Sequence, residues 1–167
     1  MSTSIRLRAI EPEDLDLIYK VENDITFWRH GTSTVPYSRY TLKQYIASSQ
    51  NNIFADGQVR LVIETIDGQS IGLADLYSFD PTNLRAEVGI LLLPPFQGKG
   101  LGSETLRQLA VYARLIHLHQ LWATIAISNK AAEHAFAHAG FKQKAYLSDW
   151  LRQADSFVDA AIWQLML

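Results

Sequence analysis

The chain alternates between segments in which every second residue is apolar and segments in which apolar residues recur every three or four positions. Residues 4–10 (SIRLRAI) alternate apolar with charged or small residues, which predicts a half-buried strand. Residues 11–24 repeat with helical spacing and carry proline and acidic residues in the first turn, as helix N-termini do. Residues 38–49 predict a second, short helix that Ser38 caps. The chain therefore opens as strand, helix, helix.

The middle of the chain has the pattern of three strands. Residues 59–79 form two runs rich in β-branched and aromatic residues, joined by Asp67-Gly68, a strong signal for a β-hairpin. Residues 85–93 are apolar at nearly every position from Val88 on, so this strand should be covered on both faces and lie centrally in the sheet. Its Gly89 predicts a β-bulge.

The second half returns to alternating helices and strands. Residues 102–116 predict a helix packed on the sheet, and residues 121–128 predict a strand. Asn129 should cap a short helix that Gly140 ends. The tail, residues 142–167, predicts two strands around a polar turn. This order predicts a mixed α/β protein with a mostly antiparallel sheet.

Composition narrows the range of functions. The 167 residues, 48% of them hydrophobic, allow one sizeable core, so we expect a single domain over residues 1–167. A net charge of -2 gives no basic footprint for nucleic acid. The chain has no cysteine, no segment apolar enough to span a membrane and no apolar leader, which predicts a cytoplasmic protein with neither nucleic acid nor membrane as partner.

A glycine-rich loop, residues 97–102 (QGKGLG), lies between a predicted strand and a predicted helix. Gly98, Gly100 and Gly102 leave room for an anion near the backbone N–H groups and the positive end of the helix, and Lys99 adds a positive charge. The spacing matches neither the Walker nor the dinucleotide-binding glycine motif. An ordinary tight turn, in which glycines only permit close packing of helix and strand, explains the glycines equally well.

The chain resembles the GNAT family of acyl-CoA N-acyltransferases. The family's phosphate loop has glutamine or arginine, then glycine three positions later, then glycine or alanine two positions further, and Gln97, Gly100 and Gly102 match it. The segments RAEVGI, NKAAEHAFAHAGF and the terminal F-x-D-x-x-x-W resemble the branch that contains spermidine and ribosomal-protein N-acetyltransferases. The resemblance covers most of the chain and implies the GNAT fold, a single mixed, mostly antiparallel sheet of six or seven strands flanked by about four helices.

The resemblance also implies a position for acetyl-CoA as co-substrate, between the splayed strands EVGILLL and LWATIAIS. The pantetheine should pair with the backbone of Ile90, Leu91 and Leu92. The remaining residues that the resemblance places at the cofactor are Gln97, Gly98, Lys99, Gly100, Leu101, Gly102, Ser103, Asn129 and Phe136. For Asn129, a role as helix cap alone is an equal alternative.

Acetylation of an amine requires a neutral amine and a donor for the tetrahedral oxyanion. Alkylamines are mostly protonated at neutral pH, so a base or a water relay is needed. Glu87 matches the family's glutamate and is the candidate base, although it could instead pair with Arg85 or face solvent. The family places the oxyanion donor at a backbone N–H around Leu91 or Leu92, next to the expected bulge; we assign Leu92.

The match fails at the general acid. Relatives carry a tyrosine in the helix after the asparagine, where it protonates the departing thiolate, and this chain has Phe136. Losing a general acid typically costs about 10² to 10⁴ in rate, but a thiol of pKa about 8.5 is a tolerable leaving group as its anion. Tyr146 and Ser128 are weak substitutes.

We therefore expect an acetyl-CoA-dependent N-acetyltransferase acting on a primary amine by direct attack in a ternary complex. A small polyamine-like or amino-sugar acceptor is preferred, with a protein N-terminus or lysine second. Glu22, Asp24 and Asp75 could attract a cationic amine or be ordinary surface charges. The alternative is a noncatalytic acyl-CoA-binding sensor or interaction module, which Phe136 motivates.

Two further expectations concern metals and assembly. His134 and His138 have the spacing of a metal pair but lack a third ligand, so no metal site is expected. Edge strands near the C-terminus with Trp150 and Trp163 allow a homodimer.

Overall fold

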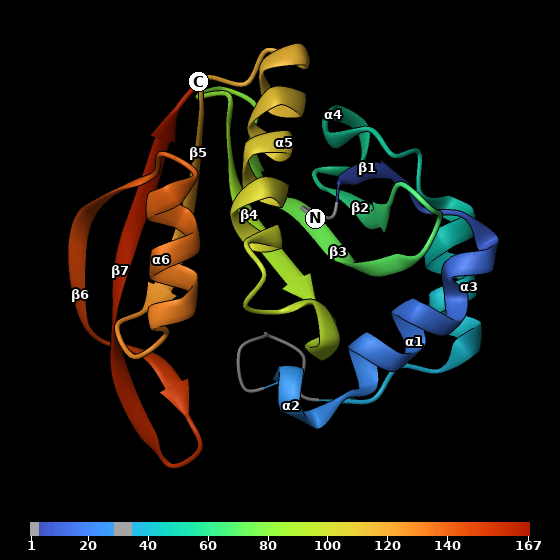
Figure 1. The fold of residues 1–167 in the computed structure, drawn as a ribbon, viewed down its shortest axis with the longest axis horizontal. Helices are drawn as coiled ribbons and strands as arrows, with labels where there is room; N and C mark the ends of the chain where they lie inside the picture. The colour runs from blue at the N-terminus through green and yellow to red at the C-terminus, as the bar shows by residue number, and fades with distance from the viewer. Residues whose placement is uncertain (1–3, 29–34) are drawn as a thin grey trace.

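The computed structural model describes residues 4–28 and 35–167; for Phe27 and Trp28 it describes the backbone alone. Its described strands form one seven-stranded sheet in the order β1-β2-β3-β4-β5-β7-β6 (Figure 1). The strands are β1 Ile5–Ala9, β2 Val59–Thr65, β3 Ser70–Asp80, β4 Arg85–Leu92, β5 Gln120–Ala126, β6 Lys142–Gln153 and β7 Ser156–Met166. Neighbours pair antiparallel except β4 with β5, which are parallel. The mixed, mostly antiparallel sheet is as predicted.

Four described helices have nine or more residues, which confirms the expected number, and two are single turns of four residues. The longer ones are α1 Leu15–Asn23, α3 Arg39–Ser48, α5 Leu101–Leu115 and α6 Lys130–His138; the shorter ones are α2 Ile25–Trp28 and α4 Ile53–Asp56. Two 3-10 turns, η1 Pro12–Asp14 and η2 Pro94–Phe96, precede α1 and follow β4.

Local sequence accounts for the ends of these elements. Ser38 accepts a hydrogen bond from the Thr41 N–H and caps α3 as predicted. The β2–β3 hairpin turns at Asp67-Gly68, with Gly68 at a φ of 91°. At the end of α6, Gly140 has a φ of 94° and the Phe141 N–H bonds the Phe136 carbonyl, the Schellman pattern.

The sheet buries apolar side chains on both faces. On one face, the buried sides of α5 and α6 pack on alternate residues of β2 to β5, with Leu106, Leu109 and Phe136 among the members of this larger core. On the other face, α1 and α3 cover Val62 and Leu73 in a smaller core. Figure 1 shows α5 and α6 in front of the sheet and α1 and α3 beyond β3. The ion pair between Arg60 of β2 and Glu22 of α1, described below, lies on the side of the sheet that α1 covers.

Candidate active site

The sheet opens between its two central strands. β4 and β5 are paired at only three positions, Arg85 with Gln120, Ala86 with Leu121 and Glu87 with Trp122. Beyond Glu87, β4 continues to Leu92 paired with β3, and β5 continues to Ala126 paired with β7. Figure 1 shows the two strands diverging towards the loop that leads into α5. The expected splay is therefore present and begins directly after Glu87.

Backbone groups of β4 face this opening. The Leu93 N–H bonds the Ile71 carbonyl on β3, while the Leu84 carbonyl accepts from the β5 side. Because successive residues of a strand point their N–H and C=O groups to opposite sides, Ile90 and Leu92 face the opening and Leu91 faces β3. The Gln97 side chain donates to the Leu92 carbonyl at 2.8 Å, which ties the loop to the end of β4.

The prediction of a β-bulge at Gly89 is wrong. Gly89 pairs in register with Asp75, and the irregularity in this ladder lies on β3 between Tyr77 and Asp80. A Cβ atom on Gly89 would lie 3.2 Å from Cε1 of Tyr77. Gly89 therefore makes room for an aromatic ring of the neighbouring strand.

The glycines of the loop serve two different purposes. Gly98 and Gly100 have φ angles of 71° and 78°, and an added Cβ would meet nothing within 4 Å. These two allow a left-handed backbone beside open space. At Gly102 a Cβ would lie 3.5 Å from Cβ of Ala135 and 3.6 Å from Cδ1 of Ile90, which are ordinary contact distances, so α5 and α6 approach closely here but an alanine would also fit.

The N-terminus of α5 has no side-chain cap. Gly100 occupies the N-cap position, so the first N–H groups of the helix keep their hydrogen-bonding capacity and their partial positive charge. Lys99 is exposed in the loop, with its Nζ 5.7 Å from the ring centroid of Phe96. Leu101 and Ser103 are buried in the first turn. This end of the opening can hold an anion such as a pyrophosphate.

Glu87 is half-buried at the point where the strands separate. It does not pair with Arg85, whose guanidinium bonds Asp80 at 3.0 Å. Burial raises the pKa of Glu87 above its ordinary value, and hydrogen bonds from Tyr77, Ser78 and the Thr124 backbone partly oppose this. A carboxylate with a raised pKa beside an opening is suited to accept a proton.

Asn129, the N-cap of α6, is half-buried, whereas Phe136 within α6 is buried. Asn129 accepts a hydrogen bond from the Ala132 N–H at 3.1 Å, so it caps α6 as expected. Phe136 is only 4% exposed and packs edge-on against Phe141, with ring centroids 4.8 Å apart. Of the substitutes for the missing tyrosine, Tyr146 bonds the Asp159 carboxylate on the neighbouring strand, and Ser128 is exposed just before Asn129.

Sequence reasoning missed the residue that organises the nearby acidic side chains. Arg60 on β2 bonds Asp75 at 2.8 Å through two nitrogens and also bonds Glu22 of α1. Burial alone would lower the pKa of Arg60, but these two carboxylates raise it above its ordinary value. Asp24 is apart from this network and bonds Thr26. An arginine in a strand gave no signal, because its partners lie 15 and 38 residues away.

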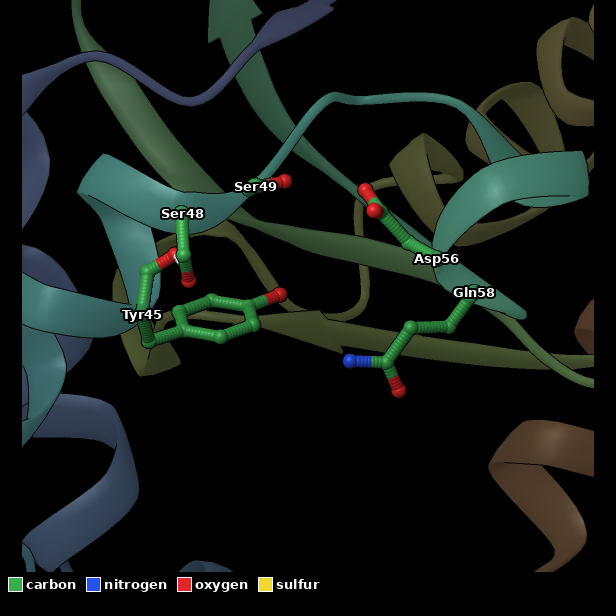
Figure 2. A pocket seen from close by; sticks show the side chains of 5 residues that line it. All are labelled: Tyr45, Ser48, Ser49, Asp56 and Gln58. Atoms are coloured by element: carbon green, nitrogen blue, oxygen red, sulfur yellow. Dashed lines mark hydrogen bonds between the residues drawn. The ribbon is translucent and has the colours of Figure 1, made fainter.

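A hollow of about 200 Å³ lies between the end of α3 and α4, just before β2. It is lined by Tyr45, Ser48, Ser49, Asp56 and Gln58. Figure 2 shows the Tyr45 ring and the Gln58 amide pointing towards each other across it. Burial raises the pKa of Tyr45 above its ordinary value, and smaller contributions come from the charges of Arg60, Asp75, Glu22 and Asp56. Because the network acts electrostatically on this wall of the hollow, we refer to the two together as the polar region around Arg60.

Two further findings concern metal ligands and membrane-spanning helices among the described residues. Within residues 4–28 and 35–167 no three histidine, cysteine or acidic side chains come together as metal ligands; His134 and His138 stack at 4.2 Å on an exposed helix face. No helix in the described part of the chain is both long and apolar enough to cross a bilayer.

Comparisons with known proteins agree with this geometry. A family model described as an acetyltransferase (GNAT) domain matches residues 4–142. A spermidine N(1)-acetyltransferase of Escherichia coli is 27% identical over 145 residues, which is 86% of this chain and 76% of that protein. One from Vibrio cholerae is 25% identical over 151 residues, covering 88% of this chain and 84% of the relative.

A solved structure shares the fold. The spermidine N-acetyltransferase of Vibrio cholerae, in complex with CoA and spermine, superposes with a TM-score of 0.83 at 24% identity. The match covers 97% of this chain and 95% of that one.

Proposed function

Because the chain belongs to the GNAT acetyltransferase family and is an N-acetyltransferase, we propose that it moves the acetyl group of acetyl-CoA to a primary amine. The observation that carries the proposal is the opening between β4 and β5, with Glu87 at its start and the glycine loop at its far end. We further propose that residues 1–167 act as one domain, since one sheet contains all the described strands.

Most residues that we predicted for the cofactor suit acetyl-CoA, except Leu91, whose backbone faces β3 instead of the opening. The gap-facing backbone of Ile90 and Leu92 offers hydrogen bonds to the amides of pantetheine. The loop glycines and the first turn of α5 offer N–H groups and a positive dipole to the pyrophosphate, and Gln97 holds this loop to the end of β4 through its bond to the Leu92 carbonyl. Asn129 lies at the end of the second splayed strand, and its side-chain nitrogen is not used in capping.

Acetyl-CoA supplies an acyl group activated as a thioester. Glu87 takes a proton from the acceptor's ammonium, which frees the nitrogen lone pair to attack the thioester carbonyl carbon. The Leu92 N–H, which faces the opening, donates to the oxyanion that forms. Glu87 passes the proton from the ammonium to solvent and can then accept another. The C–N bond forms and the C–S bond breaks, the attacking nitrogen gives its second proton to Glu87, and the thiolate takes up a proton from water, so that one proton is released in each turnover. The reaction uses no metal.

Phe136 cannot protonate the thiolate. Its ring is buried against Phe141. The Tyr146 hydroxyl bonds Asp159 on β7, and no described contact holds Ser128 at the opening. We propose that the thiolate leaves as the anion and is protonated by water, since a thiol of pKa about 8.5 tolerates this.

The polar region around Arg60 supports a small polycationic acceptor. Glu22 and Asp75 share one arginine, so this network carries a net charge of about -1, and Asp56 adds another carboxylate beside the hollow. With the reacting amine at Glu87, a second ammonium of a polyamine could lie here. The two curated relatives are named for spermidine, which favours a polyamine over an amino sugar, and both over a protein N-terminus or lysine.

Thiol release from acetyl-CoA by the purified protein tests the proposal, with spermidine, spermine, amino sugars, amino acids and N-terminal peptides as acceptors. We expect release that depends on the polyamine. Release with peptides alone would reject the acceptor class, and no release with any amine would reject the transfer reaction.

A further inference from the structure

The strand beside Glu87 contains a β-bulge. Between the pairs Tyr77 with Glu87 and Asp80 with Arg85, β3 advances three residues while β4 advances two. Ser78 in this bulge has a φ of 49°, a left-handed conformation that a serine adopts only at a cost in strain. Strain of this kind persists where the surrounding structure enforces it, often at functional sites.

The bulge brings two consecutive side chains to one carboxylate. In a regular strand Tyr77 and Ser78 would point to opposite faces of the sheet. Here the Ser78 Oγ donates to Oε2 of Glu87 at 3.3 Å. The Tyr77 phenol pairs across the strands with Glu87 and acts to lower the pKa of the same carboxylate. The Thr124 backbone of β5, across the opening, also acts to lower the pKa of Glu87.

The position of this cluster matches the beginning of the opening. Glu87 is the last residue of β4 that pairs with β5. The Tyr77 ring lies over Gly89, two residues further into the unpaired stretch, where any side chain would crowd it. The ring therefore shields one side of Glu87, and the donors fix the carboxylate where the strands part.

We propose that Tyr77 and Ser78 are positioning residues for acetyl transfer, which hold the Glu87 carboxylate at the mouth of the opening through the bulge in β3. The inference rests on the proposed function, in which Glu87 takes the acceptor's proton. Neither hydroxyl needs to touch the substrates for this role.

The charges around Glu87 give the role a pH signature. Among the described residues, the titratable group that faces Glu87 is the Tyr77 phenol, and the next along β3 is Asp75, which is paired with Arg60. Burial raises the pKa of Glu87, and the Tyr77 and Ser78 hydrogen bonds lower it. Removing either hydroxyl should therefore raise the pKa of Glu87 further.

Tyr77→Phe and Ser78→Gly test this, because each removes one hydroxyl at little cost to the fold. Phenylalanine keeps the ring over Gly89, and glycine adopts the positive φ of position 78 without strain. Tyr112→Phe is the matched control, since the Tyr112 phenol is half-buried in α5 and packs in the larger core. For each variant the acidic limb of kcat/KM against pH should move to higher pH, with about a tenfold loss below the limb for each pH unit moved.

A second measurement reads the carboxyl group without turnover. Carbon NMR of the protein labelled at the glutamate side-chain carboxyl, with Glu87 assigned by Glu87→Gln, gives its titration directly. We expect the Glu87 resonance to titrate at higher pH in Tyr77→Phe and Ser78→Gly than in the parent and the Tyr112→Phe control.

The outcomes separate the inference from the proposed function. If the pKa of Glu87 is the same in both variants as in the parent, Tyr77 and Ser78 do not hold its carboxylate, whatever the rates are. A moved titration with an unmoved rate profile in an active enzyme overturns their catalytic role. A parent protein without amine-dependent thiol release rejects the proposed reaction and with it that catalytic role, while the titration still decides whether the hydroxyls hold Glu87.

Discussion

At the scale of single residues, function and stability oppose each other at Glu87. A carboxylate whose pKa is raised by burial favours folding only when it is protonated; this contribution is present below the pKa of the unfolded chain and is lost as pH rises through the folded value. At neutral pH the ionised group is therefore a cost to the fold. Active-site groups commonly carry such a cost.

Replacing Glu87 by glutamine should separate the two effects. We expect kcat/KM to fall by about 10² to 10⁴, because the base is lost. The free energy of unfolding at pH 7 should rise, and the difference should vanish near pH 4, where both side chains are neutral. Thiol release and urea denaturation at the two pH values measure this. The exposed Glu13, changed to glutamine, is the control; equal stability of the Glu87 variant and the parent at pH 7 would contradict the sign.

Phe136→Tyr introduces the tyrosine that the family resemblance led us to expect, at the cost of a buried hydroxyl. Because the Phe136 ring packs against Phe141 in the core, the added group has to be desolvated. We expect the unfolding free energy to fall by about 1–3 kcal/mol and kcat to rise less than tenfold. Thermal unfolding and thiol release check both. A hundredfold gain in kcat would show that the ring turns to the thiolate during the reaction.

At the scale of elements, the strands and turns follow from local sequence, while the details of the site depend on neighbouring strands. Alternation, Asp67-Gly68 and the Gly140 stop correctly predicted β1, the β2–β3 hairpin and the end of α6. The bulge at Ser78 contains no glycine, so nothing in the sequence signalled it. Gly89 was misinterpreted because the group that requires a glycine there, the Tyr77 ring, lies on another strand.

A second glycine escaped sequence reasoning for the same kind of reason. A Cβ on Gly72 of β3 would overlap the Leu91 carbonyl oxygen of β4, so this position brings the two backbones together beside the predicted cofactor strand. Arg60 was missed as well, since its carboxylate partners come from α1 and β3. The position of the opening was correctly expected, but from family resemblance rather than from periodicity.

Alanine substitutions in the glycine loop should distinguish its two kinds of glycine. Gly100→Ala forces a side chain into a left-handed backbone and should cost about 1–2 kcal/mol. Gly102→Ala makes only ordinary contacts with Ala135 and Ile90 and gains helix propensity, so stability should be unchanged or rise by up to about 1 kcal/mol. Urea denaturation of both variants checks this; equal losses would mean that the two glycines share one role.

At the scale of the whole molecule, a cluster of ion pairs links the edge strand β1 to β2 and to the turn before α1. Arg8 bonds both Asp14, at 2.7 and 2.8 Å, and Glu64, at 2.8 Å. Hydrogen bonds from Arg8 and Arg6 hold the pKa of Glu64 below its ordinary value. For Asp14, burial acts to raise the pKa, but bonds from Arg8 and the Glu11 backbone keep it low. The cluster thus joins β1, β2 and the turn before α1.

The pH dependence of stability should report this cluster. Lowered carboxyl pKa values contribute stability above the unfolded values of about 4, and it is lost as pH falls through the folded ones. We expect the unfolding free energy to drop below about pH 4.5. Arg8→Met should cost on the order of 3 kcal/mol at pH 7 and flatten that drop. Urea denaturation between pH 3 and 7 measures both, with the exposed Arg114→Met as control; an unchanged slope in Arg8→Met would contradict the assignment.

The β6–β7 hairpin carries large apolar side chains in solvent, with Trp150 57% and Phe157 60% exposed. Such groups commonly mark an interface. We therefore expect this chain to form a homodimer through the hairpin. Sedimentation velocity should show an oligomer that Trp150→Glu with Phe157→Glu dissociates, whereas Val111→Glu, an exposed apolar site on α5, should not. A parent that sediments as a monomer would contradict the expectation.

The short ladder between β4 and β5 also affects how long the protein resists proteolysis. With three paired positions, β4 and β5 form the shortest ladder among the described strands of the sheet. Beyond Glu87, the side of β4 that faces the opening has backbone groups without a strand partner. A ligand whose amides pair with these groups takes the place of an eighth strand. Bound at 100 times its dissociation constant, it would add about 2.7 kcal/mol to folding. The supply of acetyl-CoA would then govern how long each molecule survives proteolysis, in addition to how fast it works.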